Sequence, residues 1–162
     1  MDIHTQAADG TTDRIERSIV IDAPRERVWR AIADADEFGT WFGADLRGQA
    51  FVAGQRVRGA ITIPGFEHVA FDVVTEHVDP ERLLSYRWHP YAVDANVDYS
   101  RETPTLVTFT LEDAPGNATR LTVVESGFDN VPPHRRLEAF RMNNNGWDAQ
   151  LGNIARHAGE PK

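Results

Sequence analysis

The chain has 162 residues, of which 41% are hydrophobic and 26% are charged, and its formal net charge is −8. This composition is typical of a single globular domain and excludes the disordered and fibrous classes. The chain contains no cysteine, which excludes disulfides, thiolate catalysis and Cys-ligated metal centres. Its basic residues are scattered, so no basic stripe is available to bind nucleic acid.

The N-terminal residues 1–13 are polar and are predicted to form a flexible tail. They lack the basic start and apolar run of a secretory signal, and no later stretch has the length of a membrane span. We therefore expect a cytoplasmic protein with no membrane insertion.

The first strand is predicted at residues 14–21, where Ile15, Ile19 and Ile21 alternate with polar residues. Pro24 then suits the first turn of a helix, because its missing N–H would have no partner there. This helix is expected to end near Ala33.

A second short helix is expected to follow directly. Asp34 or Asp36 can cap its first turn, and Phe38, Trp41 and Phe42 fall on one of its sides.

Turn residues divide the next part of the chain into strands. Pro64-Gly65, Asp79-Pro80 and Pro115-Gly116 are strong turn signals, and the segments between them alternate apolar and polar residues. The expected strands are 46–52, 55–63, 69–78, 83–89, 105–111 and 119–125. Residues 90–104 carry two prolines and no clear period, which predicts a long loop.

The longest helical pattern runs from Pro133 to about His157, with apolar residues spaced three and four apart. A strand, two short helices, further strands and one long helix do not form an alternating βαβ pattern. The order favours an α+β fold with an antiparallel sheet of about seven strands, curved around the C-terminal helix. Side chains or a ligand must fill the space between sheet and helix.

Four segments carry a family resemblance: IDAPRERVWRAIADADEFGTWF, VDPERLLSYRW, LVTFTLEDAPGNATRLTVVESGF and NNNGWDAQLGNI. Together they resemble the SRPBCC superfamily, also called START-like or Bet v 1-like, and within it the branch of activator of Hsp90 ATPase homologue 1-like proteins. The resemblance implies one START-like domain at residues 14–158 with a helix-grip fold. It also implies a cavity between the sheet and the C-terminal helix, used across the superfamily for apolar molecules.

The family cavity and the inward parity of the strands and long helix nominate a set of ligand-binding residues. An ordinary core position is the alternative for most of them, and Trp41 and Phe42 are expected at the pocket mouth or packed against the long helix. The candidates are Trp41, Phe42, Phe71, Tyr86, Trp88, Phe109, Val123, Glu125, Phe140, Asn144 and Trp147.

Glu125 is the most unusual candidate, because it shares parity with Leu121 and Val123 and so points a carboxyl group toward the helix. It could be an acid or base with a raised pKa, or an anchor for a ligand's polar group. Alternatively, the strand ends there and the carboxyl reaches water or an Arg. His89 is the only further residue from which acid–base chemistry with Glu125 could be built.

The six His residues show no metal-binding spacing, and no glycine-rich phosphate loop is present, so no metal or cofactor is expected. We therefore expect binding of a small hydrophobic or aromatic molecule. The alternatives are a cyclase- or hydrolase-type enzyme using the same cavity, and a chaperone partner of the Hsp90 type, for which the sequence shows no dedicated surface. A homodimer is possible, but no residue pattern selects one.

Overall fold

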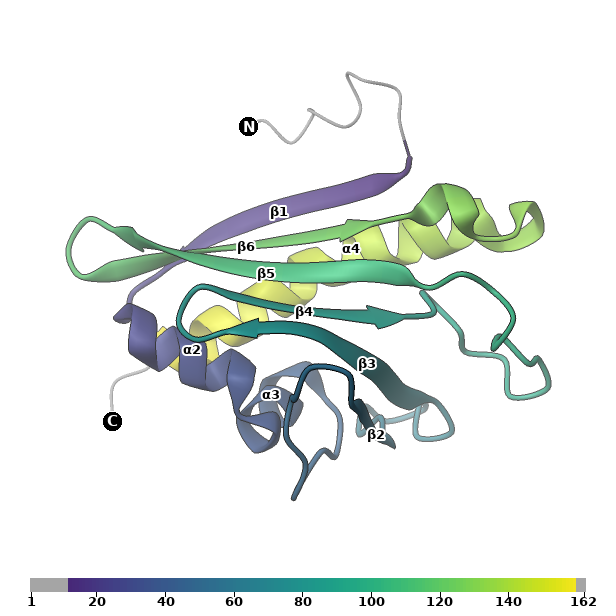
Figure 1. The fold of residues 1–162 in the computed structure, drawn as a ribbon, viewed down its shortest axis with the longest axis horizontal. Coiled ribbons are helices and arrows are strands. Elements are labelled where there is room, and N and C mark those ends of the chain that lie inside the picture. Colours follow the sequence, from purple (N-terminus) through teal and green to yellow (C-terminus); the bar gives the residue numbers. More distant parts are fainter. Residues whose placement is uncertain (1–11, 160–162) are drawn as a thin grey trace.

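The computed structural model describes residues 12–159, which form an antiparallel six-stranded sheet with helices on one of its faces (Figure 1). The elements in chain order are β1 (Arg14–Ile21), α2 (Arg25–Ala33), α3 (Ala35–Phe42), β2 (Arg56–Ala60), β3 (Ala70–Asp79), β4 (Leu83–Trp88), β5 (Thr105–Ala114), β6 (Ala118–Ser126), the 3-10 turn η1 (Phe128–Asn130) and α4 (Pro133–Gly159). The predicted tail, residues 1–13, lies almost entirely outside the described residues. Within the described range, no helix is both long enough and apolar enough to cross a membrane.

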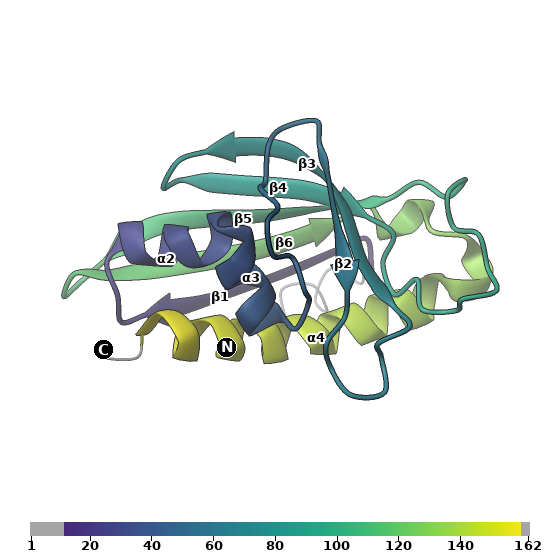
Figure 2. The ribbon, with the colours of Figure 1, turned by 90° about the horizontal axis from the view of Figure 1, so that it is seen from below.

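The strand order is β1-β6-β5-β4-β3-β2, so β1 pairs with the last strand of the chain and all other neighbours are consecutive. Helix α4 runs along one face of the sheet, and α2 and α3 lie beside its C-terminal part (Figure 2). This arrangement confirms the predicted α+β helix-grip fold.

The short helices begin where the sequence indicates, and α2 ends at Ala33 as expected. The Asp34 carboxylate accepts a hydrogen bond from the Glu37 backbone N–H at 3.2 Å, which caps α3. Gly43 ends α3 with a φ of 96°, a left-handed conformation that favours glycine. The long helix is confirmed as well, and it continues to Gly159.

The strand expected at 46–52 is wrong. The side chain of Gln49 bonds both the N–H and the C=O of Arg58, so it takes the place of a backbone partner at the edge of β2. Asp45 crosses β2 so closely that a Cβ at Gly59 would lie 1.9 Å from its carbonyl oxygen. The alternating pattern of 46–52 therefore belongs to an irregular segment along the sheet edge, and β2 is shorter than predicted.

The interior between the sheet and the helices is filled by aromatic side chains. Neighbouring ring centroids lie 5.1–6.3 Å apart, which is the usual spacing of interacting aromatic pairs. This aromatic cluster consists of Phe38, Phe42, Phe71, Tyr86, Trp88, Phe109 and Trp147.

Candidate functional site

Glu125 lies on β6 and faces the interior, with its side chain completely buried. It pairs with Ile15 of β1 on one side and with Val107 of β5 on the other, and both of these residues are also fully buried. Strand parity therefore predicted its direction correctly. The carboxyl group does not reach water, and among residues 12–159 no Arg or His forms an ion pair with it.

Four neutral side chains donate hydrogen bonds to the Glu125 carboxylate. Trp147 Nε1 donates to Oε1 at 2.9 Å, and Trp88 Nε1 donates to Oε2 at 2.7 Å. Thr105 Oγ1 lies 2.5 Å from Oε2, and Asn143 Nδ2 lies 3.0 Å from Oε1. Indole and amide N–H groups can only donate, so both oxygens of Glu125 act as acceptors toward Trp147, Trp88 and Asn143.

Burial and hydrogen bonding act on Glu125 in opposite directions. Burial raises the pKa of its carboxyl, because a charge is costly away from water, while the donors from Thr105, Trp88, Trp147 and Asn143 oppose that rise. All of these donors are neutral. In its ionised form, Glu125 is therefore solvated by the dipoles of these side chains and is not paired with a cation among residues 12–159.

A polar row crosses the inner face of the sheet beside Glu125. Val107 pairs with Tyr86 of β4, and Tyr86 pairs with Thr75 of β3, so that Thr75, Tyr86 and Glu125 face the same side. Tyr86 is fully buried and Thr75 is 1% exposed, yet neither hydroxyl has a hydrogen-bond partner within residues 12–159. The pKa of Tyr86 is raised well above its usual value, mainly by burial and to a smaller extent by the nearby carboxylate of Glu125.

The aromatic cluster reaches the surface at one place, which we call the aromatic edge: the half-buried rings of Phe42 and Trp88, whose centroids lie 6.0 Å apart. Helix α4 flanks this edge, since Gln150 Nε2 donates to the Phe42 carbonyl at 2.9 Å. Gly146 lies on the same flank of α4, one turn before Gln150. Gly146 is exposed, and a Cβ there would meet no described atom within 4 Å, so the surface of the helix is open at this point.

The loop 90–104 is held against the start of α4 by Arg135. Its guanidinium forms an ion pair with Glu102 at 2.6 Å, donates to the Pro90 carbonyl at 2.7 Å and lies 4.7 Å from the Tyr99 ring centroid. His89, at the start of this loop, is half-buried, and burial lowers its pKa while Glu102 opposes and Arg135 reinforces that change. His89 is not among the side chains that bond Glu125.

The structure brings together most of the residues nominated from the sequence. Six rings and one acid surround the site: Phe42, Phe71, Tyr86, Trp88, Phe109, Trp147 and Glu125, with Val123 buried beside Phe109 on the same face. Trp41 lies beside the aromatic cluster, with its ring centroid 4.7 Å from that of Phe38 and 5.8 Å from that of Phe42, and its indole N–H donates to the Ala31 carbonyl at 2.8 Å. Two candidates lie elsewhere: Phe140 packs against Phe128, and Asn144 accepts a hydrogen bond from Arg17 at 2.6 Å.

Sequence reasoning missed Thr105 and Asn143. Thr105 stands at the start of β5, and only the pairing of β4 with β5 brings it beside Trp88 and within reach of Glu125. Asn143 was passed over in favour of Asn144, which lies about 100° further round the helix. A signal was available, because Asn143 and Trp147 are four residues apart and so share a face.

A family model matches residues 22–159, which is most of the chain, and its description is activator of Hsp90 ATPase homolog 1-like protein. The chain belongs to this family. It is thus an AHSA1-like protein of the SRPBCC superfamily, as its sequence segments indicated. A search of the curated proteins found no match.

Solved structures share the fold of this AHSA1-like chain. DynU16, a protein in the dynemicin biosynthetic locus, is 25% identical with a TM-score of 0.65; the match covers 90% of this chain but only 46% of DynU16. A protein from Arthrobacter aurescens is 18% identical with a TM-score of 0.74, covering 93% and 88% of the two chains. The Aha1 dimer from Colwellia psychrerythraea is 19% identical with a TM-score of 0.65, covering 90% and 96%.

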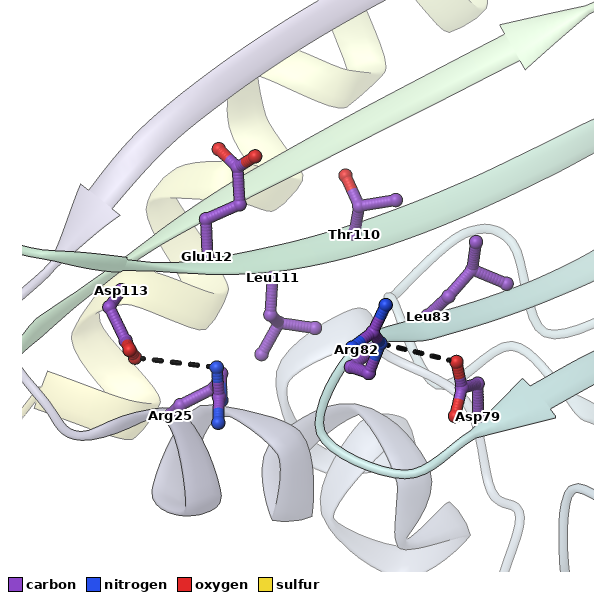
Figure 3. A pocket seen from close by; sticks show the side chains of 8 residues that line it. All are labelled: Arg25, Asp79, Arg82, Leu83, Thr110, Leu111, Glu112 and Asp113. Atoms are coloured by element: carbon purple, nitrogen blue, oxygen red, sulfur yellow. Dashed lines mark ion pairs between the residues drawn. The ribbon is translucent and has the colours of Figure 1, made fainter.

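The AHSA1-like chain also has a pocket of about 450 Å³ at the other end of β4 and β5, away from Glu125 (Figure 3). Arg25 and Arg82 line it together with three acidic side chains, and ion pairs join Arg25 to Asp113 and Arg82 to Asp79. Its arginines are already matched by carboxylates and its lining is mostly charged. It contains none of the residues nominated from the sequence.

Proposed function

We propose that this AHSA1-like protein binds a small aromatic or other apolar molecule at the aromatic edge, between the sheet and α4. The observation that carries the proposal is the continuity of the aromatic cluster from the core to the surface. Phe42 and Trp88 contact buried rings on one side and remain partly open to solvent on the other. A flat apolar ligand placed on them would extend the ring packing and remove apolar surface from water.

Gly146 supports the proposal independently. Glycine in a helix interior costs about 1 kcal/mol relative to alanine, so a structural reason is expected for it. No neighbouring atom excludes a Cβ at Gly146, which means that packing within the chain does not require glycine. A ligand lying against the bare helix backbone would require it.

The geometry favours binding over catalysis. A general base needs a free lone pair directed at its substrate. Both oxygens of Glu125 already accept hydrogen bonds from Trp88, Trp147, Thr105 and Asn143. The carboxylate is thus better suited to fix the surrounding rings in place than to take up a proton from a substrate. The chaperone-related alternative rests on the family description alone.

The test uses neutral aromatic probes, such as naphthylmethanol and indole, and measures Kd by titration calorimetry for the wild type and two variants. Gly146→Leu fills the open space beside the aromatic edge. Asn145→Leu is the matched control, because this exposed neighbour points about 100° away on the helix.

We expect Gly146→Leu to weaken binding by about tenfold or more, as a lost apolar contact of this size would, and Asn145→Leu to bind like the wild type. Equal affinity in all three proteins, or no binding to the wild type, would refute the proposal.

A further inference from the structure

We infer that the preferred ligand carries a positively charged nitrogen, so that the site selects apolar amines over neutral or anionic molecules of the same shape. This inference rests on the proposed function, and it specifies the chemical class of the ligand. It follows from three features at the site: an acid without a cation, a wall of aromatic rings and a buried hydroxyl without a partner.

The first feature is the uncancelled charge of Glu125. Buried acids are usually paired with a basic residue. Here the partners are two indoles, a hydroxyl and an amide, and no ion pair to Glu125 occurs within residues 12–159. The ionised carboxylate therefore leaves a negative potential inside the aromatic cluster, where the low dielectric preserves it.

The second feature is the ring wall. Trp88 lies 6.0 Å from Phe42, 5.3 Å from Tyr86 and 5.8 Å from Trp147, measured between centroids. The faces of aromatic rings carry partial negative charge and attract a cation within about 6 Å of the centroid. Trp is the strongest of these partners, and Trp88 stands at the solvent side of the cluster, where a ligand would first make contact.

The third feature is the Tyr86 hydroxyl, which is buried and unpartnered on the same sheet face as Glu125. A buried hydroxyl without a hydrogen bond is costly, and most such groups in folded proteins have a partner. Its oxygen can accept a hydrogen bond from an ammonium group, which offers up to three donors. A ligand carboxylate at the same place would instead face the charge of Glu125.

The experiment compares three probes of one shape: naphthylmethylammonium, naphthylmethanol and naphthoate, titrated into the full chain at neutral pH. We expect the ammonium to bind about tenfold tighter than the alcohol, as charge-assisted bonds and cation–π contact would give. Naphthoate is expected to bind about tenfold weaker than the alcohol because of repulsion from Glu125.

Two variants locate the origin of the preference. Glu125→Gln removes the charge and is expected to bring the ratio of ammonium to alcohol affinity close to one. Glu37→Gln is the matched control, because it removes a negative charge elsewhere in the chain and should leave this ratio unchanged.

If Glu125→Gln does not fold, Tyr86→Phe replaces it. Loss of the hydroxyl is expected to weaken the ammonium about fivefold and to leave naphthoate unaffected. An ammonium that binds the wild type no better than the alcohol overturns the inference and leaves the proposed function in place. If none of the three probes binds, the proposed function itself fails.

Discussion

Two glutamates, Glu125 in the sheet and Glu37 in α3, sit in contrasting environments. Glu37 contacts two arginines and a histidine: Arg27 Nη1 lies at 2.8 Å, Arg30 Nε at 3.1 Å and His157 Nε2 at 2.9 Å. Burial opposes its ionisation, but Arg27, His157 and Arg30 outweigh that effect and lower its pKa to about 2. Within the described part of the chain, the donors to Glu125 are all neutral, and burial raises its pKa.

The difference lies in how the charge of each glutamate is balanced. Glu37 joins α3 to α2 and to the end of α4, and its charge is cancelled where it stands. Glu125 also connects the sheet to α4, through Asn143 and Trp147, but its charge extends into the aromatic cluster and acts on Tyr86. The proposed preference for a cationic ligand rests on this uncancelled charge.

The largest effect is expected from Glu125→Gln. Its amide would present N–H donors to side chains that are themselves donors, and such buried mismatches cost on the order of 2–4 kcal/mol in the free energy of unfolding. Urea denaturation measures the loss, with the exposed Glu138→Gln on α4 as control. Equal stability of the two variants would show that the four donors do not hold the carboxylate.

An intermediate effect on stability is expected when Glu37 is protonated at acidic pH. Its pKa in the folded protein, about 2, lies below the ordinary value of 4.5. The contribution of ionised Glu37 to the free energy of unfolding is therefore complete above about pH 4.5 and is lost as the pH falls toward 2. We expect the difference in unfolding free energy between the wild type and Glu37→Gln to shrink by on the order of 1 kcal/mol, after discounting for solvent screening, between neutral pH and about pH 3. A difference independent of pH would rule out the cation pairing as its source.

The smallest effect is expected from Tyr86→Phe in the free protein. The change removes a hydroxyl that has no partner and keeps the ring in the aromatic cluster. Stability should stay level or rise by up to about 1 kcal/mol, because no hydrogen bond is lost. Thermal unfolding without ligand measures it, and a clear loss of stability would mean that the hydroxyl has a partner in the free protein.

The fold could be predicted because its signals are local. Alternation marks the strands, turn residues separate them, and the period of the long helix is unambiguous. The inward direction of Glu125 followed from parity alone. The strand expected at 46–52 failed because alternation does not reveal whether a segment has a backbone partner, and the Gln49 side chain occupies that place along β2.

The sequence by itself determined the order of the elements, and strand parity placed Glu125 on the same face as Leu121 and Val123, beneath a long helix. Only the tertiary structure decided which side chains form hydrogen bonds with Glu125. Thr105 and Trp88 reach Glu125 through strand register, and Asn143, not Asn144, reaches it through the rotation of α4. Register and helix rotation are set by packing between segments far apart in the chain. Two consecutive residues of α4 therefore differ completely in their contacts: Asn143 donates to Glu125 in the core, whereas Asn144 accepts a hydrogen bond from Arg17.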